Sequence, residues 1–371
     1  MTRSRPRTVS MAATLLAALT LGACGALVGV RAVATARPGA TTYHEVQVDG
    51  RSRRFLLHLP PDAARRRVPL VLAFHGHGGN GATLRAVSRL DSAADALGFA
   101  VVYPDGTGTL GWMGLSWNAG TCCGQAQERG VDDLAFVDTV VATLARSAPV
   151  DTAGVFAVGF SAGGMLALRL ACARASTFTA VADLAGAMPD VPCMPTHPVS
   201  VLLVQGVDDD ELRFDLRTLP RPHGHSFAHS LEEAQRFWAT VDGCAAGVLA
   251  GDSTTSRISA HAVGCLAGVA VELISIARHP HAWPGGLATW PLAPQPSLEV
   301  DASRLVLEFF QNAGARHRLP SEPTSPGTSP EHRRRTSSHT SRSQARLGDG
   351  RCVRVHRDRM ESCAPGRRDG S

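Results

Sequence analysis

The chain contains 371 residues, of which 44% are hydrophobic and 19% are charged; this composition is typical of a globular protein with enough apolar side chains to build a core. All 37 basic residues are arginine, and the formal net charge is +5. The positive charge lies at the ends, because residues 315–371 hold 13 Arg against 6 acidic residues, whereas residues 8–314 hold 21 Arg against 26. The acidic body of the chain argues against a nucleic-acid-binding protein.

The N-terminal residues 1–36 are predicted to be an export signal, because three arginines precede an apolar run from Met11 to about Val30. Two cleavage sites remain open. The sequence Leu-Gly-Ala-Cys at 21–24 is a lipobox pattern that would leave a lipid-anchored Cys24, whereas Ala-Thr-Ala at 34–36 is a signal peptidase pattern. A retained membrane anchor is the weaker alternative, since Arg31 interrupts the apolar run.

The C-terminal residues 315–371 are predicted to be a disordered, Arg-rich tail. They contain almost no large apolar side chains, so burial cannot offset the entropy lost on ordering them. Residues 40–313 remain as the expected folded domain.

Nine cysteines are present, with Cys24 in the signal region and Cys352 and Cys363 in the tail. The other six cysteines lie in the body of the chain, and an even number of cysteines in an exported protein predicts that they pair as three disulfides. The six are Cys122, Cys123, Cys172, Cys193, Cys244 and Cys265. We expect a local Cys244–Cys265 pair and leave the other pairings open. A metal site is not expected: the body has no CxxC pair, and His223, His225 and His229 lack an accompanying carboxylate pattern.

In chain order, the domain begins with a predicted hairpin of strands 43–48 and 54–59, joined by Asp49-Gly50. Strand-like and helix-like segments then alternate. The expected strands are 68–74, 99–103, 155–158, 199–204 and 270–276, and the expected helices are 84–97, 132–146, 162–173, 230–238 and 301–312. This alternation predicts a single α/β domain with a mostly parallel, doubly wound sheet, and active sites of such sheets lie beyond the carboxyl ends of the strands.

A nucleophile motif follows the strand at 155–158. Gly159-Phe160-Ser161-Ala162-Gly163 is G-x-S-x-G between a strand and a helix, the context in which this motif exposes a reactive serine. The small flanking residues allow a tight turn, and the alternative is a glycine-rich packing turn. We predict Ser161 as the nucleophile.

A serine nucleophile needs a base and an acid, which follow it in the order acid then histidine in this kind of fold. Three adjacent aspartates, Asp208, Asp209 and Asp210, follow the strand at 199–204, and the pattern does not choose among them. His279 and His281 follow the strand at 270–276. His281 lies deeper in its loop.

An oxyanion hole needs two backbone N–H groups close to the serine. We predict Ala162, which follows the nucleophile, and His77 of the glycine-rich loop 75–79. His75 is expected to support this loop. Trp117 and Trp283 could shape a substrate pocket, with core packing as the alternative.

These motifs together resemble the secreted polyhydroxybutyrate depolymerase and feruloyl esterase-like α/β-hydrolases, from about Tyr43 to Phe310. The shared stretches are LAFHGHGGN, VVYPDG, SWNAGTCCG, RGVDDLAFVD, VGFSAGGMLALRLAC, VQGVDDD, DGC and HAWPGG. The family pattern HGTxD selects Asp209 as the acid, and GHxWPGG selects His281 as the base. The chain departs from these patterns at Gln205, where the family has His, and at Pro280, where it has Gly.

The resemblance implies a serine carboxylic-ester hydrolase that works through an acyl-enzyme, without a metal or cofactor, as an extracellular or cell-envelope monomer. Its expected substrates are feruloylated or acylated polysaccharides or hydroxyalkanoate polymers and oligomers. The alternative is a catalytically inactive cell-envelope binding protein that retains the hydrolase fold.

Overall fold

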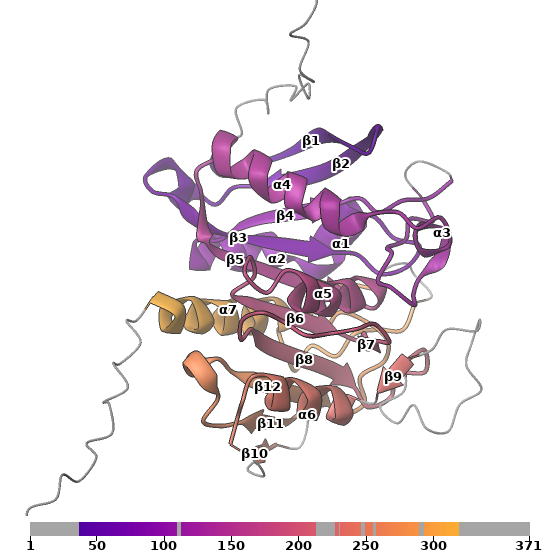
Figure 1. The fold of residues 1–371 in the computed structure, drawn as a ribbon, viewed down its shortest axis with the longest axis vertical. Coiled ribbons are helices and arrows are strands. Elements are labelled where there is room, and N and C mark those ends of the chain that lie inside the picture. Colours follow the sequence, from indigo (N-terminus) through magenta and orange to yellow (C-terminus); the bar gives the residue numbers. More distant parts are fainter. Residues whose placement is uncertain are drawn as a thin grey trace, which may run out of the picture. The chain divides into compact units, whose positions relative to one another are not determined.

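A ten-stranded sheet runs through the described part of the chain, with the strand order β1-β2-β4-β3-β5-β6-β8-β12-β11-β10 (Figure 1). The structure is a computed structural model that describes residues 37–109, 113–212, 227–229, 231–245, 249–254, 257–288 and 293–318. The predictions for the signal region, Cys24, Cys352, Cys363, His223, His225 and residues 319–371 lie outside these residues.

The six central strands are parallel. In sheet order they are β4 (Ala100–Pro104), β3 (Val68–Phe74), β5 (Val150–Phe160), β6 (Ala180–Leu184), β8 (Ser200–Gly206) and β12 (Val271–Ile276). Antiparallel strands flank them: β1 (Thr41–Val48) and β2 (Arg51–His58) on one side, and β11 (Arg257–Ala262) and β10 (Leu249–Ser253) on the other. A separate two-stranded sheet joins β7 (Met188–Pro189) to β9 (Phe227–His229). The mostly parallel, doubly wound sheet predicted from the sequence is confirmed.

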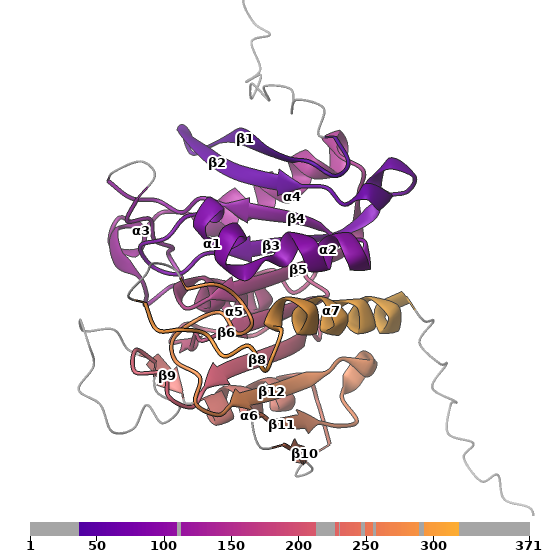
Figure 2. The same cartoon turned by 180° about the vertical axis from the view of Figure 1, so that it is seen from behind.

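Helices cover both faces of the sheet (Figures 1 and 2). One face carries α4 (Asp133–Ser147), α5 (Ala162–Ala173) and α6 (Leu231–Val241), and the opposite face carries α1 (Gly81–Ser88), α2 (Leu90–Leu97) and α7 (Ala302–Arg318). The short elements are α3 (Gly124–Glu128) and the 3₁₀ turns Pro61–Ala64 and Leu266–Gly268. Each face has its own apolar core, because alternate residues of a strand point to opposite sides.

Strand β3 illustrates the two cores. Leu70, Leu72 and Phe74 face the helices α4 and α5, whereas Val71 and Ala73 face α1 and α2, and all five are fully buried. A strand buried on both faces reads as a continuous apolar run in the sequence, which is why its position was predictable.

The predicted hairpin is confirmed, with Val48 paired to Arg51 across the turn residues Asp49 and Gly50. Both turn residues have positive φ, of 48° and 72°, the conformation that Asp-Gly favours in two-residue hairpin turns. The start of α4 is also as expected, because the Asp132 side chain accepts a hydrogen bond from the N–H of Ala135.

The single helix predicted for 84–97 is wrong, because Arg89 adopts a left-handed conformation with φ 55° and separates α1 from α2. No glycine or proline marks this break in the sequence. The prediction also omitted the short strands β6, β10 and β11, and α7 continues to Arg318 instead of ending near residue 312.

Three disulfides join the six body cysteines: Cys172–Cys193, the expected Cys244–Cys265 pair, and the adjacent Cys122–Cys123 pair. Among the helices that the structure describes, none is both long and apolar enough to cross a membrane.

Candidate active site

Four of the segments named from the sequence meet beyond the carboxyl ends of parallel strands. The loop 75–79 follows β3, Ser161 follows β5, the aspartates 208–210 follow β8, and His279 and His281 follow β12. Because these four strands run parallel in one sheet, their carboxyl ends lie along the same edge.

Ser161 occupies the turn between β5 and α5 with φ 55° and ψ −121°. A positive φ at a non-glycine residue is strained, and such strain persists only where the surroundings enforce it. Here the N–H of Ser161 donates to the carbonyl of Leu184 on β6, at 2.8 Å. The turn thus holds the serine at the N-terminus of α5, where the helix dipole favours a developing negative charge.

The two glycines of G-x-S-x-G are required by close backbone contacts. A Cβ on Gly159 would overlap the backbone of Gly163, and a Cβ on Gly163 would overlap the carbonyl of Phe74. A Cβ on Gly76 would lie 3.3 Å from the Cβ of Ser161. The loop after β3 therefore passes directly beside the serine.

Only one of the three candidate aspartates is placed to act on a histidine. Asp209 is buried, and its Oδ2 accepts a hydrogen bond from Nδ1 of His281 at 2.8 Å, whereas Asp208 and Asp210 are exposed. The Asp209 side chain is also held by Gln205, whose Nε2 donates to Oδ2 at 2.9 Å. Gln205, which stands where the family pattern has His, is a supporting residue that sequence reasoning did not identify as such.

The two candidate histidines are also distinguished. His279 is buried, its Nε2 donates to the carbonyl of Ala282 at 3.0 Å, and its Nδ1 accepts from the N–H of Ser297 at 3.1 Å. Both ring nitrogens are therefore occupied by the backbone, and burial lowers the pKa of His279. His279 braces the loop that carries His281.

The other ring nitrogen of His281, Nε2, lies 3.5 Å from Oε2 of Glu211, a residue with a mostly exposed side chain. The imidazole packs at 4.9 Å from the ring of Phe160, the neighbour of Ser161. Sequence reasoning did not identify Glu211 as a neighbour of His281. The only indication in the sequence was its position two residues after Asp209.

His75 supports the loop after β3, as its sequence position indicated. Its Nδ1 donates to the carbonyl of Gly76 at 2.8 Å, and its Nε2 accepts from the N–H of Gly106 at 3.0 Å. Burial lowers the pKa of His75 to about 4, so the ring is neutral, as these two bonds require. The carbonyl of His75 accepts from the indole of Trp117 at 2.8 Å. His75 thus ties its own loop to Gly106 and Trp117, and its ring is not free to act as a base.

Of the two predicted oxyanion donors, Ala162 directly follows Ser161, and His77 follows Gly76, which lies beside it. His77 is an exposed residue of the loop that passes Ser161. A Cβ on Gly124 would lie 2.6 Å from the imidazole ring of His77. The Cys122–Cys123 disulfide, which directly precedes Gly124, is therefore close to His77. Ala162 is the first residue of α5, so its N–H has no acceptor within the helix.

Trp117 and Trp283 are both buried. Trp117 packs edge-on against Phe74, and Trp283 donates from its indole to the hydroxyl of Ser303 at 3.0 Å. In this structure the two indoles occupy the cores of opposite faces of the sheet, which corresponds to the core-packing alternative.

A second buried acid lies beneath the serine turn. Asp183 on β6 is fully buried, and neither carboxyl oxygen has a hydrogen-bonding side-chain partner. A Cβ on Gly164 or on Gly186 would overlap its carboxyl group, so both glycines make room for it. Burial raises the pKa of Asp183 to about 8, against the opposing effect of the Gly186 N–H. Within the described residues, no group of three His, Cys, Asp or Glu side chains could hold a metal ion.

Comparison with known proteins points to esterases. Residues 53–191 match the family described as Esterase PHB depolymerase. The putative esterase NocK of Nocardia uniformis subsp. tsuyamanensis is 34% identical over 274 residues, which cover 68% of this chain and 76% of NocK. Feruloyl esterase B of Piromyces equi is 28% identical over 240 residues, which cover 63% of this chain and 43% of that esterase.

Among solved structures, the acetyl xylan esterase from Aspergillus awamori is similar with a TM-score of 0.50 and 14% identity, over 73% of this chain and 99% of that one. At this identity the likeness shows a common fold alone. It agrees with the α/β architecture described above.

Proposed function

The chain belongs to the Esterase PHB depolymerase family and is a carboxylic ester hydrolase with the α/β-hydrolase fold, and from this premise we propose that Ser161, His281 and Asp209 form its catalytic triad. The observation that carries the proposal is the 2.8 Å hydrogen bond between Nδ1 of His281 and Asp209, in a loop that also contacts Phe160 beside the serine. A buried carboxylate on Nδ1 fixes the tautomer that leaves Nε2 free to accept a proton.

The proposed reaction is a two-step acyl transfer. Oγ of Ser161 attacks the ester carbonyl while Nε2 of His281 takes the serine proton, and Asp209 stabilises the imidazolium that forms. His281 then returns the proton to the leaving alcohol. Water repeats the sequence on the acyl-enzyme and frees the acid. No cofactor takes part in this scheme.

The proposed oxyanion hole consists of the backbone N–H groups of His77 and Ala162. Its support is positional: Ala162 directly follows Ser161, and His77 follows Gly76, whose lack of a Cβ lets the loop approach the serine closely. His75, with its ring nitrogens bonded on both sides, holds this loop before substrate binds. Preorganised donors of this kind stabilise the charge that develops on the carbonyl oxygen.

The proposed substrates are esters on saccharides, either feruloyl or acetyl, with hydroxyalkanoate oligomers as the competing class. The first class draws on the names of the feruloyl esterase relatives, and the second on the family description. We further propose that the enzyme is an exported monomer, released by cleavage after residue 36 or anchored through lipid on Cys24. The intact mass of the mature protein distinguishes these two forms.

The test of the triad compares wild type with Ser161→Ala on p-nitrophenyl acetate and butyrate. We expect the variant to fall to the uncatalysed background. If wild type hydrolyses neither ester faster than the variant, the serine mechanism is wrong, and the chain would be an inactive member that only binds. A second assay with methyl ferulate, acetylated xylan and 3-hydroxybutyrate oligomers then ranks the substrate classes by kcat/KM.

A further inference from the structure

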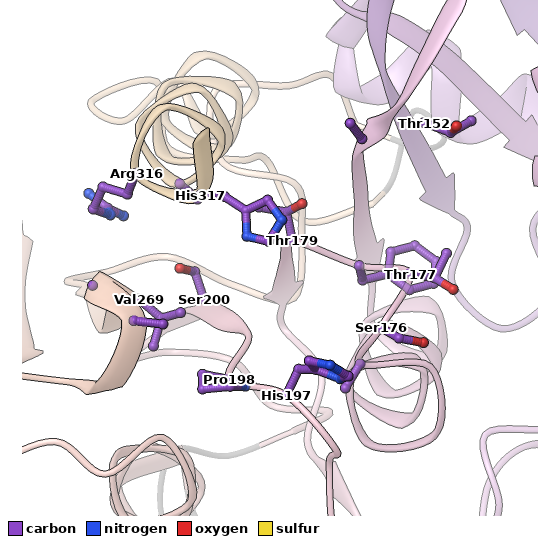
Figure 3. Close-up of a pocket in the computed structure, with 16 residues that line it drawn as sticks. Thr152, Ser176, Thr177, Thr179, His197, Pro198, Ser200, Val269, Arg316 and His317 are labelled. Carbon is purple, nitrogen blue, oxygen red and sulfur yellow. The ribbon is translucent and has the colours of Figure 1, made fainter. Parts of the chain in front are cut away.

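Figure 3 shows a cavity in the computed structure, and its volume is about 390 Å³. It lies at the end of the sheet opposite to Ser161, because its lining residues outside α7 precede or begin the strands. Its wall is formed where β5, β6, β8 and β12 begin, together with the C-terminal turn of α7. Since β8 alone spans seven residues between the cavity and the Asp209 loop, the two sites are roughly 20 Å apart. The proposed esterase chemistry makes no use of this cavity.

The wall combines hydroxyl groups with basic side chains. The hydroxyls belong to Thr152, Ser176, Thr177, Thr179 and Ser200, and the basic residues are His197, Arg316 and His317. None of the 16 residues that line the cavity is acidic. Figure 3 shows Arg316 and His317 on the helix side, with Ser200 and Val269 at the starts of the strands facing them. Such a wall favours a ligand that carries negative charge and several hydroxyl groups.

Arg316 supplies the second observation. Its Nε and Nη2 atoms are buried, and neither has a hydrogen-bond partner among the described residues. A buried N–H without an acceptor is unfavourable, so an unpaired one calls for an explanation such as a bound ion or water. Nε–H and Nη2–H point from the same edge of the guanidinium, and this edge binds the two oxygens of a carboxylate or phosphate side by side.

One acidic neighbour partly balances this charge. Burial raises the pKa of Glu272 on β12, while the charges of His261, Arg316 and Arg257 lower it. Glu272 does not line the cavity, and it leaves Nε and Nη2 of Arg316 without a hydrogen bond. No acceptor among the described residues therefore competes with an anion for these two donors.

We propose that this cavity binds a hydroxylated organic anion of monosaccharide size, with its carboxylate or phosphate group on Arg316 and its hydroxyls on the threonine and serine side of the wall. The size follows from the volume, which falls in the range of about 300–1,000 Å³ typical of small-molecule sites and is much larger than an inorganic phosphate needs.

Isothermal titration of the wild-type protein tests the ligand class with glucuronate, glucose 6-phosphate, glucose and inorganic phosphate. We expect the two sugar anions to bind, glucose to bind at least about tenfold more weakly, and raising NaCl from about 0.05 M to about 0.5 M to weaken the sugar anions. Glucuronate and glucose 6-phosphate separate the carboxylate from the phosphate form. The proposal is overturned if neither sugar anion binds, or if glucose binds as tightly as the sugar anions. It is also overturned if inorganic phosphate binds as tightly as glucose 6-phosphate.

Variants locate the site. Arg316→Gln should weaken sugar-anion binding by about tenfold or more, because it removes a charged bidentate donor, without changing kcat/KM on p-nitrophenyl acetate. Arg304→Gln is the matched control, because Arg304 is exposed on the same helix and pairs with Glu308. Since Arg316→Gln could impair folding, the exposed His197→Gln provides a second variant, expected to weaken binding without lowering the Tm. Wild-type affinity in both Arg316→Gln and His197→Gln, or an equal loss in Arg304→Gln, refutes the assignment.

Discussion

Replacing Asp209 with asparagine tests the proposed triad with almost no change in shape. The carboxylate accepts two hydrogen bonds on each oxygen: Oδ2 from Nδ1 of His281 and Nε2 of Gln205, at 2.8 and 2.9 Å, and Oδ1 from the N–H groups of Glu211 and Leu212, at 3.0 and 2.8 Å. The two backbone donors should hold the asparagine oxygen in the Oδ1 position. The new NH₂ group then occupies the position of Oδ2, facing His281.

An NH₂ group that faces Nδ1 donates to it, so the imidazole must carry its proton on Nε2. That nitrogen can then no longer accept the proton of Ser161. We expect kcat to fall by about 10³–10⁴-fold, the scale of a triad histidine held in the wrong tautomer. The Gln205 amide also loses its carboxylate acceptor while buried, which should cost about 1–3 kcal/mol of stability.

The assay is kcat and KM on p-nitrophenyl acetate, with Asp208→Asn and Asp210→Asn as matched controls. Both control side chains are exposed, so each variant should stay within about threefold of wild type. A thermal melt of each variant confirms folding at the assay temperature. If Asp209→Asn keeps more than about a tenth of wild-type kcat, or if a control loses as much, the assignment of the acid is refuted.

Three further predictions concern stability. Burial raises the pKa of Asp183 to about 8. Above about pH 4 the folded state therefore holds a proton that the unfolded state has released. The free energy of unfolding of the wild type should thus fall as pH rises from about 4 to about 8, by up to about 1.4 kcal/mol per pH unit. Between pH 5 and pH 8 the urea midpoint should fall more in wild type than in Asp183→Asn, which retains only the smaller contribution of acids such as Asp242, whose pKa burial raises to about 7. An equal fall in the two proteins would contradict the burial argument. Gly159→Ala should destabilise the fold by at least about 2 kcal/mol in the same urea assay, because the new Cβ overlaps the backbone of the following helix. The control is Gly154→Ala in the same strand, whose Cβ would meet only contacts of 3.4 Å or more and which should stay within about 1 kcal/mol of wild type. A urea midpoint equal to that of wild type in Gly159→Ala would show that the turn can relax. Removing the Cys244–Cys265 disulfide by double alanine substitution should cost about 3 kcal/mol, given a sequence separation of 21 residues, and a change below about 1 kcal/mol in calorimetry would indicate that this loop is already constrained.

Much of the fold was predictable because the signals are local. The strand at 68–74 and the helix at 162–173 have the same bounds in the structure as in the prediction, since each depends on its own apolar pattern and on nearby glycines. The G-x-S-x-G turn is local in the same way, because the steric limits on Gly159 and Gly163 act within a few residues.

The errors lie where tertiary contacts override local preference. Nothing in the composition around Arg89 marks the break between α1 and α2, where this residue takes a left-handed conformation. Strand β6 is five residues long and is defined by its pairing with β5 and β8. Composition also left open whether Trp117 and Trp283 line a pocket, and their burial against opposite faces of the sheet became visible only once the layers were assembled.

The candidate site was likewise predictable only in part from the sequence. The residues alone indicated that a serine, one of three aspartates and one of two histidines would gather at one edge of the sheet, because strand order and motif context are written in the chain. The choice of Asp209 over its two neighbours depended on a family pattern in the sequence, whereas in the structure it depends on burial and on a bond to His281, 72 residues away. Solvent exposure and distance between remote segments are properties of the assembled sheet, so three chemically identical aspartates become different only in the folded state.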